Sequence, residues 1–154
     1  MTERGADGER PRLPPLSKER WDADARAVLE ASFGAEAAAR FLSPADDAPP
    51  IPSVLGALMH HPQLAGPWLA YNNVLLRTPA LDARHRELIV LRVAWRTRSP
   101  YEWAQHVRMA ARSEITPEEV AAVSLAADAP QWSPLESALL SATDELLDHY
   151  RVDD

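Results

Sequence analysis

The chain has 154 residues, of which 46% are hydrophobic and 25% are charged, so it is long enough for one globular domain with a buried core. Its net charge of -7 argues against a general affinity for nucleic acid or for anionic lipid. It contains no cysteine, which excludes disulfides, thiolate metal sites and thiol nucleophiles. No apolar run reaches transmembrane length and the N-terminus lacks the apolar core of a signal peptide, so we expect a cytoplasmic protein.

The N-terminal segment, residues 1–20, is expected to be a disordered or extended arm. Its first ten residues are charged and lack apolar spacing, and the prolines of PRLPPL (11–16) favour an extended chain. Leu13 and Leu16 could still dock on the folded part. We interpret residues 21–154 as a single helical domain, and we suspect that it is truncated at its C-terminus, because the last four residues look like the start of a loop.

Apolar residues recur at helical spacing from Trp21 onward, and no run alternates in the manner of a strand. This pattern predicts an all-α fold, a helical bundle. The prolines of residues 43–52 predict a loop. The expected helices are 21–32, 52–60, 64–77, 82–97, 100–113, 117–125 and 134–150.

Three helix starts carry the sequence of a capping box, in which Ser or Thr is followed by Pro and, at the third helical position, Glu. The three pairs are Ser99 with Glu102, Thr116 with Glu119, and Ser133 with Glu136. The helix over 82–97 is apolar around much of its circumference, which predicts a central position or a subunit contact. Its arginines then need acidic partners or access to water.

One group of residues can carry acid/base chemistry. Ser99, Glu102 and His106 fall on one face of the helix over 100–113, with Glu102 about 60° and His106 about 20° from Ser99. Glu87, on the preceding helix, can meet them if the two helices pack antiparallel. A carboxylate beside an imidazole orients the ring and stabilises its charged form, which makes a competent acid/base pair.

Three phrases of the sequence are HPQLAGPWLAYNNVLLR (61–77), RHRELIVLRVAWRT (84–97) and YEWAQHV (101–107). On these phrases the chain resembles the carboxymuconolactone decarboxylase family, which shares an alkylhydroperoxidase D-like helical fold. In the redox members of that family a Glu is followed by Cys-x-x-Cys-x-x-x-His. By spacing, that Glu falls on Glu87 and the His on His106, while the two cysteine positions hold Ser99 and Glu102.

The resemblance therefore implies a member without the redox centre. It disfavours thiol peroxidase or peroxiredoxin activity and favours the decarboxylase branch, a lyase that acts on a small carboxylate or lactone. His106 would then supply a proton, with Glu87 or Glu102 setting its charge. The resemblance also implies a homo-oligomer, a trimer or a hexamer.

The predicted substrate-binding residues are Ser99 and the arginines Arg92 and Arg96, because a guanidinium can hold a carboxylate in a bidentate pair. We expect no cofactor, since neither a phosphate loop nor a dinucleotide fingerprint is found. A metal site is not expected either, because no histidine has a ligand-spaced partner. The expected partner is a small molecule, with no nucleic acid and no membrane.

Structural explanations remain open for each of these residues. Ser99 and Glu102 could be only the two halves of a capping box, and His106 could be a core histidine bonded to Glu102. Glu87 could pair with an arginine of its own helix. The tryptophans at 68, 95, 103 and 132 are more often core or interface anchors than ligand contacts. A catalytically silent oligomeric or binding protein of the same fold is therefore the alternative to an enzyme.

Overall fold

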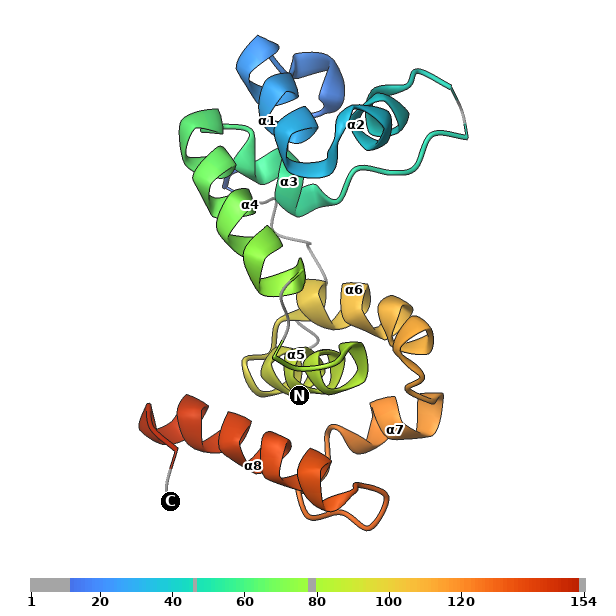
Figure 1. Cartoon of the computed structure of the whole chain (residues 1–154), viewed down its shortest axis with the longest axis vertical. Coiled ribbons are helices and arrows are strands. Elements are labelled where there is room, and N and C mark those ends of the chain that lie inside the picture. Colours follow the sequence, from blue (N-terminus) through green and yellow to red (C-terminus); the bar gives the residue numbers. More distant parts are fainter. Residues whose placement is uncertain (1–11, 46, 78–79, 153–154) are drawn as a thin grey trace, which may run out of the picture. The chain divides into compact units, whose positions relative to one another are not determined.

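The computed structural model describes residues 12–45, 47–77 and 80–152. Within these ranges every regular element is a helix and no strand is present (Figure 1), which confirms the predicted all-α fold. None of the described helices is both long and apolar enough to cross a membrane. The arm predicted for the first residues lies, up to residue 11, outside the described part.

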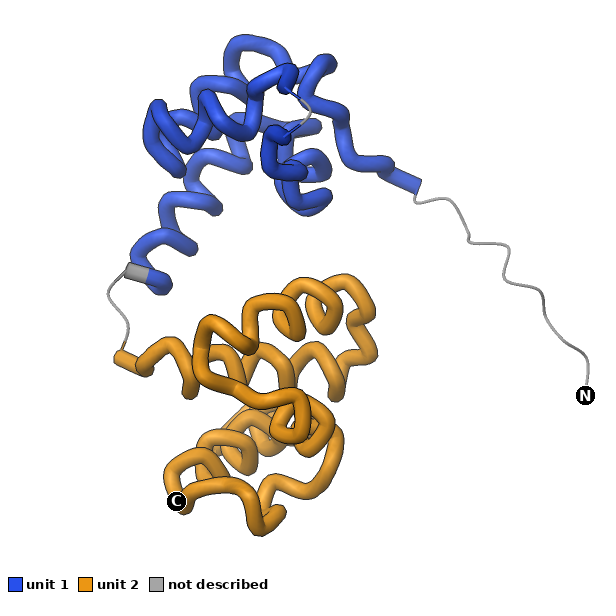
Figure 2. The backbone as a smooth tube through the Cα atoms, turned by 90° about the vertical axis from the view of Figure 1, so that its right-hand side faces the viewer, with its two compact units in different colours: residues 1–78 blue, residues 79–154 orange. Residues whose placement is uncertain are grey.

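Contacts divide the chain into two compact units, residues 1–78 and residues 79–154 (Figure 2). The first unit contains a short 3-10 turn (Lys18–Arg20) and the helices α1 (Ala23–Phe33), α2 (Ala35–Leu42), α3 (Ser53–Leu58) and α4 (Pro62–Arg77). Helix α1 packs against both α2 and α4. The core of this unit consists of Trp21, Ala25, Leu29, Ala38, Leu55, Met59, Ala65 and Leu69.

Helix α2 was not predicted. Gly34 has a φ of 87°, a conformation that side-chain-bearing residues rarely adopt, and it joins the end of α1 directly to the start of α2. A glycine between two short helical segments therefore turns the chain without an intervening loop. The predicted loop over 43–52 contains no helix in its described residues.

Part of the arm docks on the first unit. The Leu16 backbone N–H donates a 2.9 Å hydrogen bond to the Gly56 carbonyl. The indole Nε1 of Trp21 donates to the Leu16 carbonyl at 3.2 Å. The Leu16 side chain packs against the core of the unit, whereas Leu13 is exposed. The expectation that the arm could dock is thus confirmed for Leu16 and wrong for Leu13.

The second unit contains α5 (Ala83–Arg96), α6 (Pro100–Ala110), a 3-10 turn (Ala111–Ser113), α7 (Pro117–Ala122) and α8 (Pro134–His149). Helix α5 packs against both α6 and α8, so its predicted central position is confirmed. The core of the unit consists of Leu88, Leu91, Ala110, Ile115, Ala122, Val123, Trp132 and Leu140.

Two of the three predicted capping boxes are present. The Glu119 N–H donates to the Thr116 hydroxyl at 3.2 Å, and the Thr116 N–H donates to the Glu119 carboxylate at 2.8 Å. The same exchange joins Ser133 and Glu136, with distances of 3.3 and 2.8 Å. Both boxes fix the start of a helix, α7 in the first case and α8 in the second.

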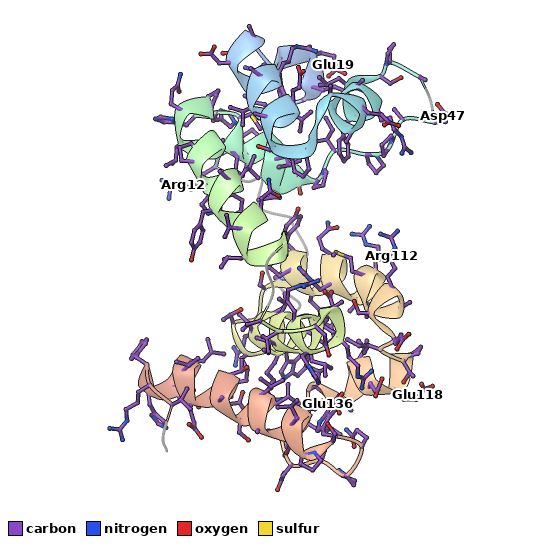
Figure 3. The ribbon with its side chains drawn as sticks, viewed as in Figure 1. Arg12, Glu19, Asp47, Arg112, Glu118 and Glu136 are labelled. Atoms are coloured by element: carbon purple, nitrogen blue, oxygen red, sulfur yellow. The ribbon has the colours of Figure 1, made fainter. Side chains whose placement is uncertain are left out.

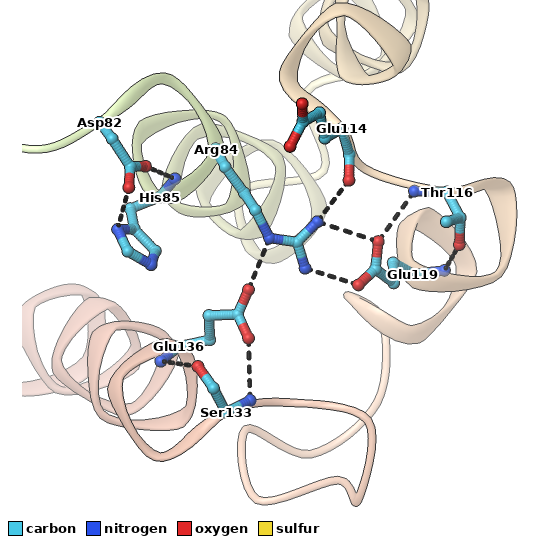
Figure 4. Close-up of polar contacts among 8 residues, drawn as sticks. All are labelled: Asp82, Arg84, His85, Glu114, Thr116, Glu119, Ser133 and Glu136. Carbon is cyan, nitrogen blue, oxygen red and sulfur yellow. Dashed lines mark hydrogen bonds and ion pairs between the residues drawn. The ribbon is translucent and has the colours of Figure 1, made fainter.

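Arg84 joins these two helix starts to α5 (Figure 4). Its Nε lies 2.7 Å from Oε1 of Glu136 and its Nη2 lies 2.5 Å from Oε1 of Glu119, while Nη1 donates to the Glu114 carbonyl at 2.6 Å. Glu136 stands at the N-terminus of α8, on the side of that helix that faces α5 (Figure 3). Each capping glutamate therefore serves both its own helix and α5.

This network shifts the pKa values of its members. The Arg84 hydrogen bond, assisted by the Thr116 N–H, outweighs burial and lowers the pKa of Glu119. Burial raises the pKa of Glu136, but hydrogen bonds from Ser133 and Arg84 outweigh it, so that pKa also lies below its ordinary value. The two carboxylates are thereby held in their charged form.

Candidate functional site

Glu87 and His106 form the closest pair among the predicted site residues. Glu87 lies in the middle of α5 with only 3% of its surface exposed, and its Oε1 is 2.7 Å from Nδ1 of His106 on α6. The antiparallel approach expected from the short α5–α6 turn is what brings the two residues together. A buried carboxylate at this distance fixes the orientation of the ring.

Glu102 approaches the other ring nitrogen. Its Oε2 is 3.5 Å from Nε2 of His106, one helical turn away, and its side chain is 48% exposed. With Glu87 on Nδ1, the Nε2 atom of His106 is the one directed toward Glu102 and the partly exposed edge of the site. His106 thus has a buried carboxylate on one nitrogen and a more accessible carboxylate on the other.

The turn between α5 and α6 closes α5 with a Schellman motif. The Arg98 N–H donates to the Trp95 carbonyl at 3.1 Å, and the Ser99 N–H donates to the Ala94 carbonyl at 2.9 Å. Arg98 occupies the left-handed position of this motif, with a φ of 54°. That position usually holds glycine.

The predicted capping box of Ser99 and Glu102 is wrong. The Ser99 side chain makes no capping hydrogen bond, and the Ser99 N–H is already used by the Schellman motif. Its ψ of 96° also differs from the extended values of 161° and 160° at Thr116 and Ser133. Glu102 therefore has no capping function here, and the contact described for its carboxylate is with His106.

A groove of about 630 Å³ lies beside this turn. Trp95 and Trp103 line it with ring centroids 5.7 Å apart, and Trp95 is 47% exposed. Ser99 and Arg96, two of the predicted substrate-binding residues, also line this groove. The complete lining is Ala94, Trp95, Arg96, Arg98, Ser99, Pro100 and Trp103.

Arg92 and Arg96 differ in their surroundings. Arg92 is buried, and its guanidinium forms a bidentate pair with Asp144 at 2.8 and 2.6 Å and donates to the carbonyls of Val123 and Leu125. These contacts tie α5 to α8 and to the end of α7. Arg96 pairs with Asp144 and with Asp148, each at 2.6 Å.

These ion pairs lower the pKa of their shared acidic partner, Asp144. Burial raises the pKa of Asp144, but Arg92 and then Arg96 outweigh it, so that pKa lies below its ordinary value. The geometry gives Arg92 a structural task, while its role in substrate binding stays a prediction. Arg96 lines the groove in addition to forming its ion pairs.

No group of three or more potential metal ligands occurs among the described residues. His60, which is adjacent to His61 in the sequence, has its Nε2 2.8 Å from the Pro14 carbonyl. His85 has its Nδ1 3.0 Å from Asp82 (Figure 4). These histidines therefore have structural contacts where the structure describes them.

The pattern of the carboxymuconolactone decarboxylase family matches residues 62–145, from α4 to α8. The chain belongs to this family. Glu87, Ser99, Glu102 and His106 all lie inside the matched region. The family match confirms the resemblance, and the all-α fold predicted from apolar spacing is consistent with the alkylhydroperoxidase D-like fold of this family. A comparison with curated proteins and with solved structures finds no significant match.

Arg98 was not among the predicted site residues, and Trp95 and Trp103 were interpreted as packing residues. The spacing contained a signal for them, because Trp95 and Arg98 flank the end of one helix while Ser99 and Trp103 begin the next. What the sequence did not reveal was that Arg98 takes the left-handed position of the turn. The groove arises from this turn geometry.

Proposed function

We propose that this chain is a cofactor-free lyase that decarboxylates a small carboxylate or lactone, with Glu87 and His106 as its acid/base pair. The observation that carries the proposal is the 2.7 Å contact between the buried Glu87 carboxylate and Nδ1 of His106. Because Glu87 occupies Nδ1, the Nε2 atom is the position from which a proton can be exchanged with substrate. Glu102 lies beside that atom and can modulate its charge.

The proposed reaction breaks the bond between the substrate's carboxylate carbon and its neighbour. Carbon dioxide leaves, and the electron pair stays on the neighbouring carbon, where a conjugated carbonyl of the substrate delocalises it. The protonated His106 then donates its Nε2 proton to that carbon and becomes neutral. Glu87 stabilises the imidazolium before transfer, and solvent returns the proton afterwards. No oxidant or reductant is required.

Substrate is proposed to bind in the groove beside the α5–α6 turn and to extend from it toward His106, which does not itself line the groove. Ser99 and Arg96 line it, and Ser99 precedes His106 by two helical turns on the same helix face. Thiol peroxidase chemistry does not fit this site, because serine and glutamate at the redox positions cannot form a disulfide and the sequence has no cysteine.

The proposal can be tested by measuring carbon dioxide release from a panel of small lactone and β-keto carboxylates. We expect His106→Gln to reduce turnover at least about a hundredfold, since general acid catalysis contributes factors of about 10²–10⁴. His85→Gln is the matched control, because His85 lies on α5 and contacts Asp82 instead. Equal turnover of His106→Gln and wild type would contradict the proposal.

The alternative from the sequence is a silent oligomeric or binding protein. Under that alternative, neither wild type nor His85→Gln releases carbon dioxide from any member of the panel, although small carboxylates still bind. The 19% exposure of the His106 side chain favours the enzyme, because a fully packed histidine would have no route for exchanging a proton with substrate.

We also propose that the chain forms a homo-oligomer. The sequence pointed to the helix over 82–97 as the contact, but much of its apolar surface is buried inside the second unit. The better candidate is α4, on which Leu64, Trp68, Tyr71 and Leu75 are exposed. Their spacing of four, three and four residues places them along one helix face, as in the seam of a coiled coil.

Light scattering tests this contact. We expect wild type to be larger than a monomer at micromolar concentration and Tyr71→Glu to shift the protein toward monomer. Leu135→Glu is the control, because Leu135 is a comparably exposed leucine on α8. A monomeric wild type, or an association state that is unchanged in Tyr71→Glu, would contradict the α4 contact.

A further inference from the structure

The groove beside the α5–α6 turn has an aromatic wall. The rings of Trp95 and Trp103 lie 5.7 Å apart at an angle of 54°, and both side chains line the groove. Nearly half of Trp95 is exposed, although an indole buries a large apolar area when it is covered. Such a wall favours a flat, unsaturated ring, which can stack on or edge against the indoles.

Arg98 supplies a cation at the rim of the same groove. Its side chain is exposed, and among the described residues it makes no ion pair, whereas Arg84, Arg92 and Arg96 are all paired with carboxylates. An unpaired guanidinium beside an aromatic wall can hold a carboxylate in a bidentate pair. The three paired arginines have already satisfied their charge within the protein.

The backbone at Arg98 takes a conformation that is unusual for arginine. Its φ of 54° is a left-handed conformation, which costs a side-chain-bearing residue about 1 kcal/mol relative to glycine. Glycine is the usual occupant of this position in a Schellman motif. Glu114 and Tyr150 share this conformation, and at Arg98 a change to glycine would remove the guanidinium while it relieves the backbone.

The third contribution comes from Ser99 and the start of α6. The Ser99 hydroxyl lines the groove and does not cap the helix, so it is available to donate to a ligand oxygen. The positive end of the α6 dipole lies at the same point, which favours an anionic group there. Arg98 and Ser99 therefore place anion-binding groups side by side, next to the indoles.

We propose that this groove binds a flat aromatic ring that bears a carboxylate, with the ring against Trp95 and Trp103 and the carboxylate on Arg98. The volume of about 630 Å³ is within the range of small-molecule sites. Trp103 precedes His106 by one helical turn on α6, so a ligand of the groove is also the substrate class of the reaction. That reading of the ligand as substrate rests on the proposed function. The carboxylate on Arg98 is then a binding handle, and the carboxylate that leaves as carbon dioxide is a second one, on a carbon outside the aromatic ring.

Three probes separate the features of the ligand. Benzoate has both the ring and the charge, benzamide has the ring without the charge, and cyclohexanecarboxylate has the charge without the flat ring. We expect benzoate to shift the indole N–H signals of Trp95 and Trp103 in a ¹⁵N NMR titration, assigned with Trp95→Phe and Trp103→Phe. The signals of the buried Trp21 and Trp132 should not move. The other two probes should bind at least about tenfold more weakly.

Substitution at Arg98 tests the charge. Arg98→Gly should raise the melting temperature, because glycine relieves the left-handed conformation, and should weaken benzoate binding about tenfold or more. Glu114→Gly is the matched control, since Glu114 also has a left-handed φ, of 56°, in the same unit. It should raise the melting temperature and leave benzoate binding unchanged. Arg98→Lys should bind benzoate with intermediate affinity.

Unmoved Trp95 and Trp103 signals at millimolar benzoate, or wild-type affinity in Arg98→Gly, would overturn the proposal. So would equal binding of benzamide, cyclohexanecarboxylate and benzoate. Benzoate binding without any decarboxylation supports this site while the proposed reaction fails. Decarboxylation of a substrate with which benzoate does not compete contradicts this site while the proposed reaction stands.

Discussion

Glu87 and His106 are 19 residues apart in sequence, yet the Glu87 carboxylate lies 2.7 Å from the His106 imidazole. The carboxylate is almost completely withdrawn from water, whereas the His106 side chain is 19% exposed. A charge buried to this extent is costly unless a partner stabilises it. The pair therefore joins a buried carboxylate to an imidazole ring that solvent can reach.

Removing the charge of Glu87 should affect chemistry more than folding. Glu87→Gln keeps a side-chain oxygen that can accept from Nδ1, but it cannot stabilise an imidazolium. We expect turnover to fall about a hundredfold or more, with a small change in melting temperature. Glu102→Gln should have a weaker effect on turnover, because Glu102 is half exposed and 3.5 Å from the ring. Initial rates and thermal melts check both, and full activity of Glu87→Gln would refute the catalytic pair.

Alanine substitutions at Ser99, Thr116 and Ser133, which stand at helix starts, should differ in their effect on the free energy of unfolding. Ser133→Ala and Thr116→Ala should each cost about 1 kcal/mol of unfolding free energy, because each removes one half of a capping box. Ser99→Ala should cost less than about 0.5 kcal/mol, because its side chain does not cap α6. Urea denaturation measures all three. A loss at Ser99 as large as at Ser133 would show that Ser99 caps α6 in solution.

This contrast shows what the sequence could predict. All three sites have the same pattern of residues, and the pattern predicted the local structure correctly where the N–H of the cap residue is free. At Thr116 the preceding turn is closed by the Ile115 N–H, which donates to the Ala110 carbonyl and leaves the Thr116 N–H for Glu119. At Ser99 the preceding helix ends only a few residues earlier, and its Schellman motif uses the Ser99 N–H. The outcome therefore depended on the left-handed conformation of Arg98, which the residue type does not suggest.

The stability of the second unit should depend on Arg84 and on acid. Arg84→Gln should cost about 2–3 kcal/mol, because it leaves two partly buried carboxylates without their cation. The pKa values of Glu119, Glu136 and Asp144 are all lowered in the folded chain. Lowered values stabilise the fold above the ordinary carboxyl pKa, and this contribution is lost as the pH falls through and below 4.5, the ordinary value for Glu119.

Denaturation at several pH values tests this dependence. The free energy of unfolding should decrease steadily as the pH is lowered from about 5 through the ordinary pKa values of carboxyl groups. The decrease should be shallower in Arg84→Gln. Arg112→Gln is a suitable control, because Arg112 is an exposed arginine of the same unit. Identical slopes in wild type and Arg84→Gln would contradict the proposed network.

Gly56 should be intolerant of a side chain. A Cβ atom at this position would lie 2.8 Å from the Leu16 carbonyl oxygen and 2.9 Å from Cβ of Pro15, which is closer than real contacts allow. Gly56→Ala should therefore displace the docked arm and destabilise the first unit by about 1–3 kcal/mol. Gly66→Ala is the control, because the nearest atom to its Cβ would be at an ordinary 3.6 Å. Limited proteolysis of the arm and urea denaturation report both effects.

Much of the fold could be predicted from the sequence, because apolar spacing and proline positions determine where each helix forms and ends. All predicted helices are found, with ends within a few residues, while α2 was missed because Gly34 replaces a loop. For the site, the shared helix face brought Glu102 and His106 together correctly. The burial of Arg92 against Asp144, and the groove at Arg98, depend on contacts between distant segments that spacing does not encode.

His106 is proposed to deliver the proton to the carbon that loses carbon dioxide. This proton transfer is tested most directly by running the reaction in deuterium oxide, on a substrate whose product carbon becomes stereogenic, and determining the configuration of the deuterium. A proton donor fixed by Glu87 should deliver deuterium to one face, giving a single stereoisomer, and the residual product of His106→Gln should be a mixture. A mixture from the wild-type protein would contradict the account, because it would mean that free solvent protonates the released carbanion.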